Sequence, residues 1–370
     1  MKKIARFLSS RIFRSIPSSG AQHRTVDDSR GCLGLQDGHP VSDIPAKGVR
    51  HTLARKRSII SLSNHYQVKM AITIISGKGE KIRRTEVKLA TSSTIKEVKK
   101  EYAKISKKNF HRISFKLGDG KDAIRLDNDE KTLDSYGVKD GSEIAFKDLG
   151  AQINYRLVFL LEYFGPMVFV LLYSIRPALI YGPDSASAEF NWVARLGIIC
   201  WTLHFLKREY ETLFIHKFSR ATMPLSNLFK NCAYYWTFGA VIGYPLSSPG
   251  FVPPAETQVQ IGLAIFALSE VGNLICHLML SNLRPAEGSQ KRTIPSGFLF
   301  NYVACPNYTF EVLSWVGFSI LTNLPFAYLF TLLGFLQMAD WAQKKHRGYK
   351  KTYDKEYTKL KRKAIIPFLF

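Results

Sequence analysis

The stretch CPNYTFEVLSW, residues 305–315, places an amide, a phenol and a carboxylate at the start of a strongly apolar run. If the run is helical, Asn307, Glu311 and Trp315 lie on one face at positions i, i+4 and i+8, with Tyr308 beside them. Polar groups at membrane depth are costly, so they usually face a cavity and mark a functional site. The alternative is that the amide and the acid only bond across a packed bundle. We favour a functional site, because a carboxylate is a poor choice for helix association alone.

The 370-residue chain divides into two unlike halves. Residues up to about 150 are charged and polar, whereas long apolar runs dominate the rest, as in a multi-span membrane protein. The formal net charge is +23, and its basic residues are spread over the N-terminal half, the loops and the tail. The positive-inside rule and attraction to anionic lipid explain this distribution, so we expect a lipid bilayer as a partner and no nucleic acid.

Motifs of several familiar chemistries are missing from the sequence. The five cysteines are not spaced as metal ligands, and neither H-E-x-x-H nor C-x-x-C occurs, so no metal site is expected. Neither G-x-G-x-x-G after a strand nor the P-loop motif is present, so the common soluble nucleotide folds are not indicated.

Residues 1–69 are expected to be a basic, disordered extension. The first twenty residues are rich in Arg, Lys and Ser, and no acid precedes Asp27, a composition that also suits a mitochondrial transit peptide. A third interpretation is an upstream start before Met70, where folded sequence begins.

Residues 70–147 are predicted to form a small α+β domain. MAITIIS (70–76) and residues 84–90 have strand character and flank the turn Gly77–Glu80. Thr94 can cap a helix, and RISFKL (112–117) and SEIAFK (142–147) follow as strands. The apolar positions of that helix recur at helical spacing: Ile95, Val98, Tyr102 and Ile105.

This ββαββ order, with TLDSYGVKDGSEI (132–144) before the last strand, resembles the ubiquitin-like domains. The chain continues through Asp148-Leu149-Gly150 without a free diglycine end, so the resemblance implies a docking module and not a conjugated tag.

From Asp148 onward, about six apolar runs predict an α-helical membrane bundle. Both the domain before the first run and the tail after the last run are basic, which places both ends in the cytosol and requires an even number of spans. The basic loops 207–230 and 284–292 then fall on that same side. The expected spans are Leu157–Ser174, Trp192–Leu206, Leu228–Leu246, Val259–Leu280, Phe298–Leu321 and Phe326–Trp341.

Three further polar clusters accompany the opening stretch at the cytosolic ends of these spans. Each cluster also has an interpretation without a functional site. In the order given below, these are a self-paired interface helix, packed core residues, and a solvated lipid-facing surface. The clusters are His204, Lys207, Arg208, Glu211 and His216; Asn273, His277 and Arg284 at i, i+4 and i+11; and His346, Arg347, Tyr349 and Tyr353.

Long stretches of residues 148–370 match a known family. They are DLGAQI (148–153), ETLFIHKFS (211–219), TMPLSNLFKNCAYYW (222–236), the opening stretch and IIPFLF (365–370). With them, the chain resembles the trans-2-enoyl-CoA reductases of very-long-chain fatty acid elongation, within the steroid 5-alpha-reductase superfamily. A ubiquitin-like domain before the bundle is also a feature of the animal members.

The resemblance implies that NADPH reduces the double bond of an enoyl-CoA thioester. Hydride adds to the β-carbon, an enolate develops on the thioester, and Tyr308 is the residue that the family uses to protonate the α-carbon. Lys207 and Arg208 are expected to supply a positive field near the enolate. Cofactor contacts are expected from Asn273, His277, Arg284, Asn307, Glu311, His346, Arg347 and Tyr349. The basic tail and loops suit both a 2'-phosphate and the phosphates of CoA.

Two other functions stay open. A steroid-type Δ4 reductase could use the same scaffold, although Phe205 occupies the place of a tyrosine that is catalytic in the steroid enzymes. A non-catalytic scaffold of the elongation complex is the second. For the favoured function we expect an acyl-CoA substrate, other elongation enzymes as partners, and a multi-pass location in the endoplasmic reticulum membrane, with the 1–69 extension diverting some molecules to mitochondria.

Overall fold

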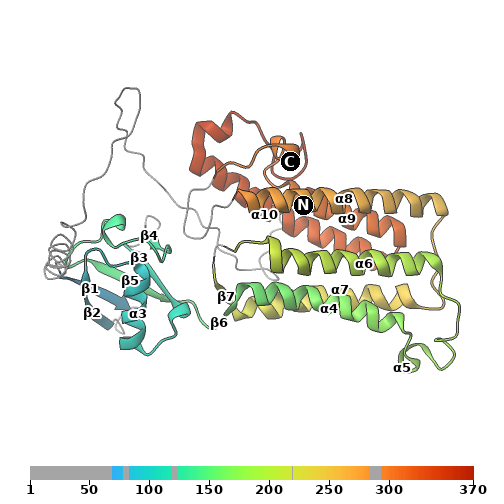
Figure 1. The fold of residues 1–370 in the computed structure, drawn as a ribbon, viewed down its shortest axis with the longest axis horizontal. Helices are drawn as coiled ribbons and strands as arrows, with labels where there is room; N and C mark the ends of the chain where they lie inside the picture. The colour runs from blue at the N-terminus through green and yellow to red at the C-terminus, as the bar shows by residue number, and fades with distance from the viewer. Residues whose placement is uncertain (1–68, 78–82, 119, 121–122, 219, 284–292) are drawn as a thin grey trace, which may run out of the picture. The chain divides into compact units, whose positions relative to one another are not determined.

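The computed structural model describes residues 69–77, 83–118, 120, 123–218, 220–283 and 293–370. The described residues divide into two compact units, 69–150 and 151–370 (Figure 1). Three features discussed above therefore lie outside the described residues: the extension up to residue 68, most of the turn that follows Gly77, and the loop that carries Arg284.

The smaller unit is built on a five-stranded sheet with the order β2-β1-β5-β3-β4. β1 (Lys69–Ser76) is antiparallel to β2 (Arg83–Ala90) and parallel to β5 (Glu143–Asp148). β3 (Ile113–Leu117) lies between β5 and β4 (Ile124–Leu126) and is antiparallel to both. The four predicted strands are present. The fifth, β4, has only three residues, too few to show an alternating pattern in the sequence.

Helix α3 (Ile95–Ser106) packs against this sheet and begins where predicted. Thr94 and Glu97 form a capping box, in which the hydroxyl of Thr94 accepts from the Glu97 amide at 3.3 Å and the Glu97 carboxylate accepts from the Thr94 amide at 2.8 Å. Three of the four predicted core positions are buried, but Ile105 is 49% exposed. Ile105 lies in the last turn, at the edge of the apolar stripe, so the prediction was wrong for that residue.

The larger unit starts with a short two-stranded ribbon. β6 (Gln152–Asn154) is antiparallel to β7 (Thr222–Pro224), and each strand leads directly into a helix. These helices, α4 (Tyr155–Ser174) and α7 (Leu225–Ser247), run side by side (Figure 1). The side chain of Asn154 caps α4 by accepting from the Leu157 amide at 3.1 Å.

Long helices occupy all six predicted apolar runs. Two of them, α4 and α8, are long and apolar enough to cross a membrane by length and composition. The fifth helix begins at Pro306 and not at Phe298, because proline at the first position lacks an amide hydrogen and favours a helix start. The other elements are α5 (Ala178–Tyr181), α6 (Trp192–Tyr210), the π-helical turn η5 (Glu211–Ile215), α8 (Glu256–Asn282), η6 (Phe298–Asn301), α9 (Pro306–Thr322) and α10 (Pro325–Thr358).

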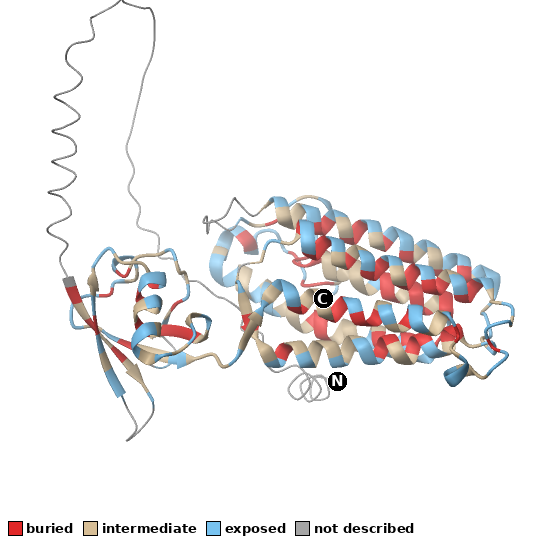
Figure 2. Ribbon diagram, turned by 60° about the horizontal axis from the view of Figure 1, so that its bottom comes forward, coloured by how far each residue is buried: buried red, intermediate tan, exposed pale blue. Residues whose placement is uncertain are grey.

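Two glycines bring α8 and α9 into close contact. A Cβ on Gly262 would lie 2.5 Å from the Leu321 amide nitrogen, and one on Gly317 would lie 2.5 Å from that of Phe266. Small residues at helix crossings allow such backbone approach. Buried positions line the inner faces of the helices (Figure 2), and the close crossing lets short polar side chains reach from one helix to the other.

Candidate active site

A network of buried charges joins α6, α8 and α9. The ammonium of Lys207 donates to Oδ1 of Asn273 at 2.7 Å and lies 2.7 Å from Oε2 of Glu270. The ring of His204 is held from both sides, with Nδ1 2.7 Å from Glu270 and Nε2 3.4 Å from Glu311. The carboxylates are largely shielded from water, with 15% and 16% of their side chains exposed. Buried charges of this kind are tolerated only when paired.

Arg208 is the centre of the second half of the network. Its guanidinium donates to Glu211 at 2.6 Å and to the hydroxyl of Tyr163 at 3.0 Å. Glu211 Oε2 also lies 2.9 Å from Nδ1 of His277. Burial by itself raises the pKa of Glu211, but Arg208 and His277 outweigh burial and lower that pKa to about 2. Glu211 therefore stays ionised at neutral pH, although its side chain is fully buried.

Asn273 connects this network to the stretch at the start of α9. Its Nδ2 donates to the backbone carbonyl of Asn307 at 2.9 Å and to Oε2 of Glu311 at 3.0 Å. The side-chain amide of Asn307 is half-buried and makes no hydrogen bond with the described residues. Glu311 and Trp315 both contact His204, the indole with a ring-centroid distance of 4.3 Å. The predicted helix and its polar face are thus confirmed for these side chains.

Tyr308 lies on a different side of α9. Its ring faces α10, with a centroid 6.2 Å from that of Trp341. It packs against a cluster of small apolar side chains that includes Cys305, Ala342 and Ile365. Within the described residues the hydroxyl of Tyr308 makes no hydrogen bond, but Arg208 of the charge network lies near enough to act on it electrostatically. The two sides of α9 therefore present different chemistry.

The remaining site predictions concern the basic end of α10. Nδ1 of His346 lies 2.9 Å from the hydroxyl of Tyr357, and the ring of Tyr349 lies 5.2 Å from that of Tyr357. Arg347 is exposed on the surface of the helix. The structure brings His346 and Tyr349 together around Tyr357, at a position distinct from the buried charge network.

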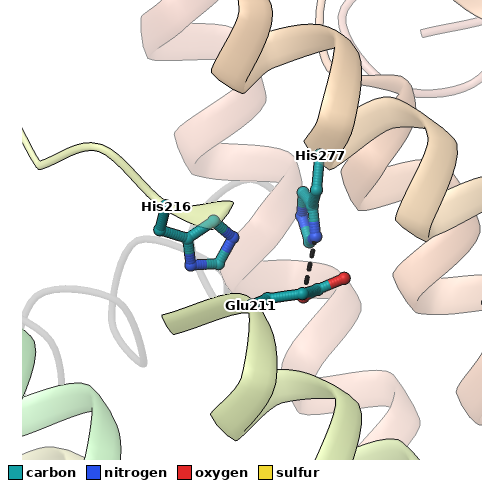
Figure 3. A group of neighbouring side chains, drawn as sticks. All are labelled: Glu211, His216 and His277. Atoms are coloured by element: carbon teal, nitrogen blue, oxygen red, sulfur yellow. Dashed lines mark ion pairs between the residues drawn. The ribbon is translucent and has the colours of Figure 1, made fainter. Parts of the chain in front are cut away.

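Glu211, His216 and His277 form a set of possible metal donors (Figure 3). Their donor atoms lie within 4.8 Å of one another, and the rings of the two histidines are 5.0 Å apart between centroids. Arg208, however, donates to the same carboxylate oxygen of Glu211 that His277 contacts. The guanidinium already supplies a positive charge to this carboxylate, which weakens its attraction for a metal ion. The absence of a metal site stays a prediction from the sequence.

Sequence patterns missed two members of the network and misjudged a third feature. Tyr163 gave no signal, and Glu270 was overlooked although an acid inside the apolar run 259–280 is itself a sign of function. The alternative of a self-paired interface helix is right about the pairing within 204–211, since Arg208 lies 2.6 Å from Glu211, but wrong about the exposure, since Glu211 is fully buried. Lys207 is 3.9 Å from Glu211 but 2.7 Å from Glu270. The partners outside this segment come from α4, α8 and α9, and spacing along one helix could not reveal them.

Comparison with known proteins gives two family matches. Residues 221–370 match the family described as 3-oxo-5-alpha-steroid 4-dehydrogenase, and residues 70–152 match the ubiquitin-like domain family. The first match contains the start of α9 with Asn307, Tyr308 and Glu311, as well as Glu270, Asn273 and His277 of α8. The second covers the five-stranded unit.

Similar proteins extend over most of the chain. A very-long-chain enoyl-CoA reductase of Dictyostelium discoideum is 42% identical over 76% of this chain and 93% of its own length. A protein of Caenorhabditis elegans named as a probable very-long-chain enoyl-CoA reductase is 43% identical over 76% and 92%. A human trans-2,3-enoyl-CoA reductase-like protein is 35% identical over 76% and 78%. The chain belongs to the family of the very-long-chain enoyl-CoA reductases.

Proposed function

We propose that this protein reduces trans-2-enoyl-CoA to saturated acyl-CoA with NADPH, the last step of the very-long-chain fatty acid elongation cycle. The observation that carries this proposal is the start of α9. One helical turn there brings Asn307 and Glu311 to a buried polar network and Tyr308, three residues before Glu311, to the adjacent, apolar side that faces α10. A reduction of this type needs a polar binding site for the nicotinamide, here called the nicotinamide cradle and formed by Asn273, Asn307 and Glu311. It also needs a proton donor next to a hydrophobic substrate.

The polar side has the donor set that a nicotinamide carboxamide requires. The carboxamide offers an NH₂ group and a carbonyl oxygen, and Glu311 can accept from the first while the unengaged amide of Asn307 can donate to the second. Asn273 fixes both by its bonds to the Asn307 carbonyl and to the Glu311 carboxylate. A reduced nicotinamide bound there would supply the hydride.

Tyr308 is the proposed acid. After hydride addition to the β-carbon, the enolate must gain a proton at its α-carbon, and the phenolic O–H bond of Tyr308 breaks to supply it. Water then returns a proton to the phenolate. Lys207 and Arg208 are each paired with a carboxylate, so we assign them mainly to holding Asn273 and His277 in place and only partly to stabilising the enolate.

The cofactor phosphates need cations outside this cradle. The family resemblance suggests Arg284, which lies outside the described residues, together with His346, Arg347 and Tyr349 at the end of α10. Arg347 is exposed and able to reach a phosphate, whereas His346 and Tyr349 both contact Tyr357. We propose His277 as a partner of Glu211 that shapes the cradle and not as a direct cofactor contact.

We further propose that the helical unit spans the endoplasmic reticulum membrane about six times, with both termini in the cytosol. Exposed positions lie on the outer faces of its helices (Figure 2). Large apolar side chains are among the exposed residues of this unit, including Leu203, Leu268 and Val271, which are 57%, 73% and 58% exposed. Exposed apolar area of this extent suits lipid better than water. In this proposal the ubiquitin-like unit, residues 70–147, docks other enzymes of the elongation complex on the cytosolic side.

The test is an assay of the purified protein and its Tyr308→Phe variant. Wild type is expected to oxidise NADPH in the presence of trans-2-enoyl-CoA, with NADH a poorer donor. Tyr308→Phe should lower kcat by about 10²–10⁴-fold, the range for loss of a general acid, with little change in thermal stability or in cofactor affinity. Turnover of the variant at the wild-type rate would refute the assigned role, and inactivity of the wild type on every enoyl-CoA length would refute the function.

A steroid-type Δ4 reductase is the second candidate, since the match over residues 221–370 is to a steroid dehydrogenase family. Phe205, which has no hydroxyl, is fully buried between Trp201, Tyr235 and Trp315 and cannot donate a proton. Assays with a 3-oxo-Δ4 steroid beside enoyl-CoA separate the two functions.

A further inference from the structure

The end of α10 and the segment that follows it enclose a basic cavity of about 340 Å³. Lys350, Lys361, Arg362 and Lys363 line it together with His346 and Tyr357, and no carboxylate of the described residues does so. The cavity is separate from the charge network at α6, α8 and α9, where each cation faces an acid. Four cations around one opening without an acid form a site for an anion.

Arg362 is the strongest sign that this anion is a ligand. The residue is 7% exposed, and its Nη1 donates to the carbonyl of Pro295 at 2.6 Å. Its Nε is buried and has no hydrogen-bond partner within the described part of the chain. A buried guanidinium donor without a partner is costly, and an anion in the cavity would satisfy it.

The electrostatics of the neighbouring side chains agree with a positive cavity. Burial lowers the pKa of His346 below its ordinary value, and Lys350 and Lys363 lower it further. Burial also lowers the pKa of Arg362. For His346, repulsion by the two lysines adds to the effect of burial, and a positive field of this kind attracts a phosphate.

The backbone at the cavity is strained. Lys361 has φ +48°, a left-handed conformation that costs a residue other than glycine roughly 1–2 kcal/mol. Strain of this kind persists where the surrounding structure enforces it and is frequent at ligand sites. Here it turns the chain so that Lys361, Arg362 and Lys363 follow one another around the cavity.

The cavity is tied to the proton donor through two connections. Along α10, Trp341 contacts Tyr308, and Lys350 follows about 14 Å further along the helix axis. In the tail, the amide of Ala304 donates to the carbonyl of Lys363 at 2.8 Å, and the hydroxyl of Thr309 donates to the carbonyl of Ile365 at 2.5 Å. The cavity therefore lies at a fixed distance from Tyr308, on the side of α9 that faces α10.

We propose that this cavity binds the 3'-phosphoadenosine end of coenzyme A when the enoyl-CoA substrate is bound. The inference rests on the proposed function. The thioester must lie at Tyr308, and coenzyme A carries its phosphates at the far end of the pantetheine arm, which suits a basic cavity further along α10. The 2'-phosphate of NADPH has similar chemistry, and proposed cofactor contacts lie at the same end of α10, so the experiment must distinguish the two phosphates. His346 is the one residue that the cavity shares with the proposed cofactor contacts.

The experiment compares enoyl-CoA with its 3'-dephospho analogue in three proteins. They are the wild type, the triple variant Lys350→Gln/Lys361→Gln/Lys363→Gln, and the matched control Lys351→Gln/Lys355→Gln/Lys359→Gln. The control removes three exposed lysines of the same region that do not line the cavity. For wild type and control, the KM of the dephospho substrate is expected to be at least about tenfold higher, the loss of one charge-assisted phosphate contact. In the cavity variant this ratio should fall close to one, while the KM for NADPH and the kcat stay near wild type.

Two outcomes overturn the inference. One is a cavity variant that keeps the wild-type KM ratio. The other is a cavity variant that loses the preference for NADPH over NADH, whatever its KM ratio, since the cavity would then bind the cofactor. Equilibrium binding of free CoA and of 3'-dephospho-CoA to the same three purified proteins needs no turnover. It tests the cavity even if enoyl-CoA proves not to be the substrate, so the two failures can be told apart.

Discussion

The two units of this protein each contain an Arg–Glu pair, and the pairs differ in burial. In the ubiquitin-like unit, Arg84 and Glu143 are 3.4 Å apart, with 67% and 49% of their side chains exposed. In the helical unit, Arg208 and Glu211 are 2.6 Å apart, with 11% and 0% exposed. Water screens the first pair, so it contributes about 0–1 kcal/mol at most. The second pair has lost its hydration and depends entirely on its partners. The same two residue types therefore contribute little to stability at the surface of one unit, whereas in the interior of the other unit the fold depends on their pairing.

The comparison predicts the largest effect for a broken buried pair. Arg208→Met should lower the free energy of unfolding by about 3–5 kcal/mol, because Glu211 keeps a buried charge without its main partner. The matched variant Arg84→Met should change it by about 0.5 kcal/mol or less. Thermal denaturation in detergent measures both. Equal effects of the two variants would show that burial does not distinguish the pairs.

A smaller change tests whether the buried network serves the cofactor. Glu311→Gln keeps the shape of the side chain but removes the charge that pairs with His204 and accepts from Asn273. We expect the KM for NADPH to rise about 10–100-fold, since a hydrogen bond to a charged group contributes about 1.5–3 kcal/mol. Glu143→Gln in the exposed pair is the control. An unchanged KM for NADPH in the Glu311 variant would remove this residue from the cofactor site.

The close crossing of α8 and α9 gives the next prediction. Gly317→Ala places a methyl group against backbone of α8, 2.5 Å from the Phe266 amide nitrogen, and the helices must move apart. The expected loss is about 1–3 kcal/mol of unfolding free energy, with a reduced kcat because Asn273 no longer reaches Glu311. Gly348→Ala is the control, as nothing lies near its added carbon. Wild-type stability and rate in Gly317→Ala would contradict the packing.

The smallest effect is expected at a partly exposed pair of the ubiquitin-like unit. Hydrogen bonds from Arg112 at 3.0 and 2.9 Å, and one from Lys108, hold the pKa of Asp148 well below its usual value, against the effect of burial. The folded pKa is lower than the unfolded one, so this stabilisation is present above about pH 4 and is lost as the pH falls below it. Asp148 is 30% exposed, which limits the contribution to about 1 kcal/mol.

Asp148→Asn should therefore cost about 1 kcal/mol at pH 7 and clearly less at pH values near 2, because the unfolded aspartate is already protonated there whereas the folded one, with its lower pKa, takes up its proton only at still lower pH. Urea unfolding of residues 69–150, which have their own core cluster, measures this dependence. A variant that is equally destabilised at both pH values would show that Asp148 acts through packing and not through its charge.

Local signals in the sequence located most elements but few contacts. The capping box at Thr94 and Glu97 and the start of α9 at Pro306 follow from residues within one turn, and such signals survive in any fold. The C-terminal end of α10 could not be predicted from local sequence signals. Its apolar pattern ends at Trp341, yet the helix continues through polar residues that favour helix formation as far as a break at Asp354, where φ is +38°, and a last helical segment ends at Thr358.

The site shows the limit more clearly. Asn307 and Glu311 were identified because an amide and an acid interrupt an apolar run at helical spacing. The contacts of Arg208 could not be identified from the sequence, because Tyr163 and His277 reach it from helices far away along the chain. A spacing of four residues suggested that Lys207 pairs with Glu211, but Glu270 on α8 offers a closer partner.

By itself the sequence determined the two-part organisation, the apolar helices and the face of α9 that carries Asn307 and Glu311, because periodicity and capping depend only on neighbours along the chain. Only the tertiary structure decided which charges are buried together and that the ring of Tyr308 faces α10. It also decided that basic residues of α10 and of the segment after it enclose one cavity. Those facts depend on how closely helices approach, and glycines such as Gly262 set that distance through contacts that no local pattern records.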